Sequence, residues 1–331
     1  MQRRQFLSSG LGAGLACAGL PPAAAASGAA GEWPVRPVKL IVPFPPGGPT
    51  DIIGRTAARV MGERLGQQIV VENKAGAGGN IGTDAVAKAM PDGYTIGLSA
   101  ISSLAIAPSL YARLPYSVER DLAPISLAGY TPCAIVAHPG APFDDLAGLI
   151  AYAKAHPGKL SYGTSGLGTS THLAAEYFQS IAGVSMLHVP YKGTSQIAQD
   201  LLAGTIPLSF ESSLTTTLPN VREGRVKVIA VTSARRSRAL PQVATVAEQG
   251  FAGFDVVTWF GLIGPARLPR ELAQRISGAW QTGSATPLAR QAFENIGADP
   301  QAGSPQQFGD FMRSETQRWG ALIRKLGIQL D

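Results

Sequence analysis

The chain has 331 residues, of which 45% are hydrophobic and 15% charged, with 39 glycines and 25 prolines. This composition excludes a disordered chain, and the length suits two α/β domains of ordinary size. The formal net charge of +6 is mild, and we interpret the densest basic cluster, Arg235, Arg236 and Arg238, as a solvated loop, so nucleic-acid binding is not expected.

The N-terminus has the organisation of an export signal. Arg3 and Arg4 precede an apolar stretch over residues 6–20 and a run of alanines at residues 23–26. We therefore predict a signal peptide over residues 1–26, cleaved near Ala26, which leaves a mature chain of formal charge +4 because the signal carries two arginines and no acid. The paired arginines also fit a twin-arginine signal, so both export routes stay open. The apolar stretch is shorter than the roughly 20 residues that span a bilayer.

The cysteines and histidines offer little for metal or disulfide chemistry. Cys17 lies inside the predicted signal, where a small apolar residue is preferred over a lipid-attachment cysteine, so Cys133 is alone in the mature chain and no internal disulfide is expected. The four histidines form no close pair along the sequence. We expect neither a metal nor a cofactor.

Short apolar segments alternate with helical patterns along most of the chain. The first unit is a strand at residues 38–42, a turn rich in Pro and Gly, and a helix through residue 65. Further strands are expected at residues 68–71, 94–98, 134–137, 160–162, 186–189, 206–210 and 226–231. After an apolar run at residues 256–264, three helices that each begin with proline are expected at residues 269–281, 287–296 and 305–326. The pattern predicts parallel sheets covered by helices.

The domain division follows from the late helices, which need a sheet to cover. We predict one lobe over residues 32–131 plus 256–331 and a second lobe over residues 132–255. The chain would then cross twice between the two lobes.

Two loops, each joining a strand to a helix, are the main candidates for a binding site. They span residues 43–51 and 161–172. Their glycines permit close approach of a ligand to the backbone, and the helix that follows each loop offers free amide groups and the positive end of its dipole. Neither loop contains Lys or Arg, so an anion would be held by backbone amides and by the hydroxyls of Thr50, Ser165, Thr169 and Ser170. Taken singly, each loop is more often a simple connection with a helix cap, but the pair favours a carboxylate site.

Other polar segments carry less weight. The glycine-rich residues 76–82 lack the spacing of a dinucleotide-binding motif, and Ser102 follows a strand where serine is also a common helix cap. Lys192 is as consistent with a solvated side chain as with an anion contact. Ser165 is not in a nucleophile elbow, because Leu167 stands where that motif needs glycine, and His172 at a helix start suits either a ligand contact or a capping role.

Several longer motifs resemble one known family, the Bug or TctC substrate-binding proteins of tripartite tricarboxylate transporters. They cover residues 33–38, 42–51, 71–82, 91–94, 166–173, 188–193, 241–250 and 315–319. The resemblance implies an α/β, periplasmic-binding-protein-like (type II) fold, with two doubly wound lobes joined by crossing strands and a ligand cleft between them.

The resemblance also implies a set of ligand-binding residues. Carried over by position, they are Phe44, Gly47, Gly48, Thr50, Asp51, Asn80 and Ser102 on one wall, and Ser165, Gly168, Thr169 and His172 on the other. Glu211 stands where the family usually has Asp, so its side chain either faces the cleft with one more methylene or is solvated.

The expected function is therefore capture of a small organic carboxylate in the periplasm, without catalysis. The carboxylate is a di- or tricarboxylate, an acidic amino acid or an aromatic acid, and the partners are the membrane subunits of a tripartite tricarboxylate-type transporter, which a monomer contacts transiently. One alternative is a sensor that presents the bound acid to a membrane kinase. Another is an enzyme that acts on a small carboxylate through Ser165 or His172.

Overall fold

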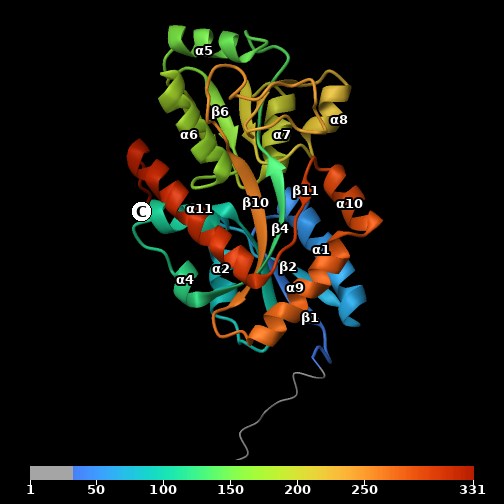
Figure 1. Cartoon of the computed structure of the whole chain (residues 1–331). Helices are drawn as coiled ribbons and strands as arrows, with labels where there is room; N and C mark the ends of the chain where they lie inside the picture. Colours follow the sequence, from blue (N-terminus) through green and yellow to red (C-terminus); the bar gives the residue numbers. More distant parts are fainter. Residues whose placement is uncertain (1–32) are drawn as a thin grey trace, which may run out of the picture. The chain divides into compact units, whose positions relative to one another are not determined.

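Two β-sheets with helices packed on them make up the part of the chain that the computed structural model describes, residues 33–331 (Figure 1). Both sheets belong to one unit, residues 34–331. The predicted signal peptide, residues 1–26, lies outside the described residues. None of the helices within residues 33–331 combines the length and the apolar character that a membrane crossing requires.

The first sheet has six strands in the order β11-β4-β10-β3-β1-β2. Its strands are β1 (Val38–Val42), β2 (Ile69–Asn73), β3 (Thr95–Ala100), β4 (Leu122–Pro132), β10 (Val257–Pro265) and β11 (Asp299–Pro300). The strand β1 is parallel to β2 and β3, whereas β10 is antiparallel to β3 and β4, so the sheet is mixed and not purely parallel.

Helices from both ends of the chain cover this first sheet. They are α1 (Pro49–Leu65), α2 (Asn80–Ala87), α3 (Ala107–Leu110), α4 (Val118–Asp121), α9 (Arg270–Ser284), α10 (Pro287–Glu294) and α11 (Pro305–Leu326), with the short turns η1 (Ala77–Gly79) and η2 (Ser102–Ile106). Helix α1 packs on α9 and α10, while α11 packs on η2 and α3. Helices from the C-terminal part of the chain therefore pack beside helices from the N-terminal part on the same sheet.

The second sheet has five strands in the order β7-β6-β8-β5-β9. Its elements are β5 (Ala134–Ala137), α5 (Leu146–Ala155), β6 (Ser161–Thr164), α6 (Ser170–Ala182), β7 (Leu187–Pro190), α7 (Thr194–Leu202), β8 (Leu208–Glu211), α8 (Thr217–Arg222) and β9 (Lys227–Val231). Alternate residues of β5 serve opposite faces: Val136 belongs to the cluster that holds Leu201 of α7, and Ile135 to the cluster that holds Phe178 of α6. Helices therefore cover both faces.

The chain passes between the two sheets twice, from β4 into β5 and from β9 back into β10. One buried hydroxyl ties the two passages together, because Thr232 Oγ1 donates to the carbonyls of Cys133 at 3.1 Å and Val256 at 2.6 Å. The six strands of the first sheet come from residues 38–132 and 257–300, and the five of the second from residues 134–231. The division into moving bodies at 131/132 and 255/256 stays a prediction.

Candidate functional site

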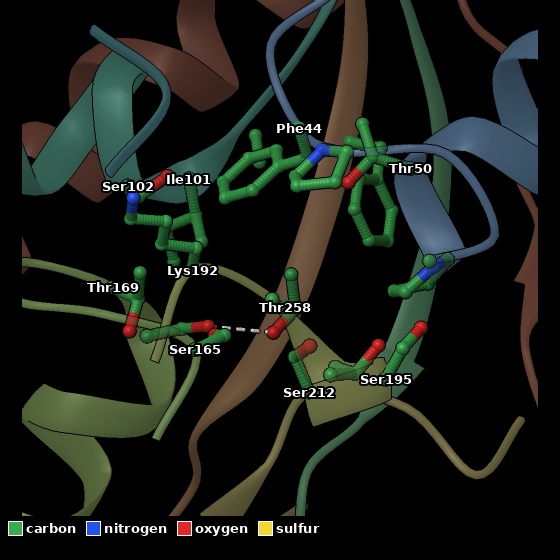
Figure 2. Close-up of a pocket in the computed structure, with 18 of the residues that line it drawn as sticks. Phe44, Thr50, Ile101, Ser102, Ser165, Thr169, Lys192, Ser195, Ser212 and Thr258 are labelled. Carbon is green, nitrogen blue, oxygen red and sulfur yellow. Dashed lines mark hydrogen bonds between the residues drawn. The ribbon is translucent and has the colours of Figure 1, made fainter. Parts of the chain in front are cut away.

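A cavity of about 290 Å³ lies between the two sheets, at the ends of the loops that the sequence singled out (Figure 2). The first sheet and its loops contribute Phe44, Pro45, Pro46, Gly48, Pro49, Thr50, Ala100, Ile101 and Ser102. The second contributes Ser165, Thr169, Ser170, Lys192, Gly193, Thr194, Ser195, Gln196 and Ser212, and the crossing strand β10 adds Thr258 and Phe260. A ligand here would touch both sheets and the strand that joins them.

The loop after β1 is held from behind by Asp51. Its carboxylate accepts hydrogen bonds from the Gly47 amide at 3.0 Å, from Arg55 Nε at 2.9 Å and from Asn73 Nδ2 at 2.9 Å. Burial by itself raises the pKa of Asp51, but the hydrogen bonds from Arg55, Gly47 and Asn73 outweigh burial and hold the pKa below its usual value. Asp51 is therefore a charged anchor under the loop, and the loop presents Gly48 and Thr50 to the cavity.

The loop after β6 is organised around the start of α6. Thr169 is the N-cap, accepting from the His172 amide and donating to the Gly166 carbonyl at 2.7 Å. The Ser165 hydroxyl bonds Thr171 Oγ1 at 3.1 Å, not His172, so these two residues do not form a nucleophile–base pair. Because α1 and α6 both begin at the cavity, their first-turn amides and dipoles favour a bound anion.

The floor of the cavity is the crossing strand β10. Thr258 Oγ1 is hydrogen-bonded to Ser170 Oγ at 2.6 Å, the dashed line in Figure 2, which links the floor to the start of α6. Phe260, two residues further along, faces the same side of the strand. The floor thus combines one hydroxyl pair with an aromatic surface.

Ser102 is the lining residue whose side chain has an unpaired polar atom. Ser102 is 4% exposed and belongs to the cavity lining, and its buried hydroxyl oxygen has no hydrogen-bond partner among the described residues. The next residue, Ser103, contrasts with it, because its buried hydroxyl is bonded to Ser99 at 2.8 Å and to Thr83 at 3.0 Å. A buried hydroxyl left unpaired costs about 1–3 kcal/mol, which a ligand would recover.

The segment before and at the start of α7 supplies further polar groups to the cavity. Of the described residues that line it, Lys192 alone carries a charged side chain, and the ammonium group has no ion-pair partner within residues 33–331. The backbone of Gly193 lies close to Pro45 of the opposite loop, since a Cβ placed on Gly193 would be 3.6 Å from the Pro45 ring. This segment therefore lies against the first loop beside the cavity.

Six of the expected site residues do not line the cavity. Gly47, with φ of 83°, and Gly168, with φ of 72°, shape the two loops from outside the lining. Asp51 anchors the first loop as described. Asn80 is 5% exposed and accepts a 2.8 Å hydrogen bond from the Tyr116 hydroxyl, which uses its side-chain oxygen elsewhere.

His172 lies beneath the second loop, in a stack of aromatic rings. Its ring is 4.5 Å from that of His188, which in turn is 5.1 Å from Tyr162 and bonded through Nε2 to Thr164 Oγ1 at 2.6 Å. Burial lowers the pKa of His172, and burial followed by the neighbouring His172 lowers the pKa of His188 to about 4. Both rings are neutral near pH 7, so the stack supports the loop without charge.

Glu211 is neither solvated nor in the cavity lining. It is 2% exposed, and its carboxylate accepts hydrogen bonds from Ser209 at 3.1 Å, Thr216 at 3.2 Å and Thr217 at 2.7 Å. Burial raises its pKa, and the three hydroxyl donors only partly oppose this. The solvated alternative is wrong for this residue, because its strand lies inside the second sheet.

Part of the lining was not predicted from the sequence. For Lys192, a solvated side chain and an anion contact were both consistent with the sequence. Thr258 was hidden inside an apolar run, where it is the one hydroxyl-bearing residue of residues 256–264. Ser195, Gln196 and Ser212 carried no local pattern of their own. Within residues 33–331 no three His, Cys, Asp or Glu side chains gather as a metal site would require.

Comparison with known proteins now decides the family. The family described as the tripartite tricarboxylate transporter family receptor, TctC, matches residues 53–328. This chain belongs to the TctC family. The predicted fold is confirmed with it, because the two-lobed α/β fold of periplasmic binding proteins is that of its solved relatives.

Three relatives illustrate the similarity to this TctC protein. Protein BugT of Bordetella pertussis is 38% identical over 92% of this chain and 94% of its own length. A Rhodopseudomonas palustris protein solved with adipate has a TM-score of 0.85 and 32% identity, covering 90% of this chain and 99% of that one. MatC of Rhodopseudomonas palustris, solved with malate, has a TM-score of 0.81 and 29% identity, covering 88% and 100%. The TctC family is one of solute receptors, and this chain is a solute-binding protein.

Proposed function

We propose that this protein captures a small organic carboxylate in the cavity between the two loops and delivers it to a tripartite tricarboxylate-type transporter in the periplasm. The unpaired hydroxyl of Ser102 is the observation that carries the proposal, because this buried hydrogen-bond donor has no acceptor among the described residues. The starts of α1 and α6 at the cavity support an anion as the acceptor. The adipate and malate found in two relatives support a carboxylate.

The lining favours an acid with a second anionic group. The lining includes three apolar side chains, those of Phe44, Ile101 and Phe260, which suit methylene groups and offer no hydrogen bonds. Lys192 and the start of α7 add positive potential to that of the starts of α1 and α6. A dicarboxylate with a short apolar spacer suits this combination of positive and apolar groups, with contacts from both lobes holding the closed form.

Ser102→Ala tests the proposal. We expect this variant to bind adipate or malate roughly tenfold more weakly while the empty protein keeps or gains stability, because the lost hydroxyl had no partner in the folded chain. Isothermal titration with a panel of organic acids gives the affinity, and urea unfolding gives the stability.

Ser103→Ala is the matched control. It removes a bonded hydroxyl outside the lining, so it should lower the free energy of unfolding by about 1 kcal/mol and leave the affinity close to that of the wild type. Unchanged affinity in Ser102→Ala, or no binding of any organic acid by the wild type, would contradict the proposed function.

A further inference from the structure

A second hollow, much larger than the ligand cavity, lies between α8 and α10. This groove, which we name the back groove, has a volume of about 1090 Å³. Its lining comes from α8 and residues 233–239 on the side of the second sheet, and from α10 and residues 297–301 on the side of the first. In Figure 1 both helices lie on the right, α8 above α10.

The back groove and the ligand cavity lie on opposite faces of the crossing strands. Thr258 and Phe260 of β10 line the cavity, whereas Val257 lines the groove, as alternation along a strand requires. The neighbouring strand agrees, because Pro132, which pairs with Val257, and Tyr130 also line the groove. Any movement of the two sheets about these strands therefore changes both hollows.

The charge of the back groove is positive and partly uncompensated. Its lining contains five arginines and three acidic residues, so the difference of five and three leaves a formal +2. Two arginines are paired, Arg236 with Glu248 at 2.9 Å and Arg238 with Asp299 at 3.8 Å. The other three are exposed and have no ion-pair partner within residues 33–331, namely Arg222, Arg235 and Arg290.

These three arginines come from separate parts of the chain and from both sheets. Arg222 ends α8 and Arg235 follows β9, both on the side of the second sheet, while Arg290 lies on α10 over the first. The lining also includes the apolar side chains of Tyr130 and Val257 on the crossing strands and of Leu218 on α8. An occupant that spans the groove would contact guanidinium groups from both sheets and these apolar side chains.

We propose that the back groove is a docking site for an acidic peptide segment of a partner protein. Charge complementarity selects an acidic occupant, and arginine pairs well with carboxylates. The apolar side chains and the three acidic residues in the lining disfavour a compact anion such as phosphate, which needs dense positive charge and no apolar contact. An extended peptide with spaced carboxylates and apolar side chains between them satisfies both features.

Fluorescence anisotropy with a labelled octapeptide of alternating glutamate and leucine tests the proposal on the full-length protein. We expect saturable binding that weakens with added salt, and a twin peptide with glutamine in place of glutamate should bind at least roughly tenfold more weakly. The double variant Arg222→Glu with Arg290→Glu, which reverses one charge on each side, should lower the affinity for the acidic peptide by roughly tenfold or more.

The double variant Arg113→Glu with Arg267→Glu is the control, because it changes the net charge equally at exposed arginines outside the groove. It should change the affinity less than about twofold. Circular dichroism and thermal melts establish that both double variants fold. Equal loss in the two variants, no binding at low salt, or displacement of the peptide by an equimolar amount of inorganic tripolyphosphate would overturn the proposal.

Discussion

Lys192 shows at the scale of a single residue how the cavity would discriminate between acids. We expect Lys192→Met to weaken adipate binding by roughly tenfold, because a charge-assisted hydrogen bond contributes about 1.5–3 kcal/mol, and to leave the monomethyl ester of adipate nearly unaffected. Titration calorimetry with both ligands measures the difference. Lys154→Met, at an exposed position of α5 outside the lining, is the control. Equal loss for the diacid and its ester would argue against a second carboxylate at Lys192.

The lowered pKa of His188 predicts how the stability of the protein depends on pH. Its pKa is lowered to about 4 in the folded protein, while an unfolded histidine titrates near 6.5. Between these values the unfolded chain binds more protons, so the stability contributed by the neutral ring is present above about pH 6.5 and is lost as the pH falls toward 4. Urea unfolding of the wild type and of His188→Gln over this range should give a shallower slope for the variant. Parallel curves would show that the folded and unfolded pKa values are alike.

At the scale of elements, the crossing strands depend on a few buried hydroxyls. Thr232 bonds both passages, so Thr232→Val should lower the free energy of unfolding by about 1–3 kcal/mol by leaving two buried carbonyls with fewer donors. Denaturant unfolding measures this loss. The control is Thr282→Val on α9, whose exposed hydroxyl bonds only the Gly278 carbonyl of its own helix and should matter little. A loss no larger than in the control would exclude Thr232 as a tether.

Local pattern predicted most of the elements and failed where the pattern was interrupted. The helix expected at residues 305–326 is α11, with a capping box at Ser304 and Gln307, and the strand expected at residues 38–42 is β1. The long strand β4 was not anticipated, because Pro124 and Gly129 interrupt its apolar residues. The antiparallel course of β4 and β10 was likewise not visible, since strand direction is set by the path of the whole chain.

For the whole molecule, the predicted lobes should move as two bodies when ligand binds. Spin labels at Lys154 and Gln281, one on each proposed lobe, should come closer by a few ångström on addition of adipate, whereas labels at Glu63 and Gln281, on the same lobe, should not. Pulsed electron spin resonance on the chain lacking residues 1–26 measures both distances. The native Cys133 is fully buried and its pKa is raised by burial, so it should stay unlabelled. A change within the control pair would contradict the boundaries at 131/132 and 255/256.

The same movement would connect the ligand cavity with the back groove. Because the two hollows lie on opposite faces of β10, closing one changes the spacing of the arginines around the other. A partner bound across the back groove would then distinguish the loaded from the empty receptor, and ligand and peptide would alter each other's affinity by the same factor.

The sequence alone determined the family, the α/β class and the two loops that begin α1 and α6, because these depend on contiguous motifs, on glycines and on local periodicity. Only the tertiary structure decided which side chains line the cavity. It turned Asp51, His172 and Glu211 into buried supports and brought Lys192 and Thr258 to the ligand's side. The physical reason is that a hydroxyl or an ammonium group looks the same in sequence whether it is solvated, capping or in a cavity, and its role is fixed by neighbours that are distant along the chain.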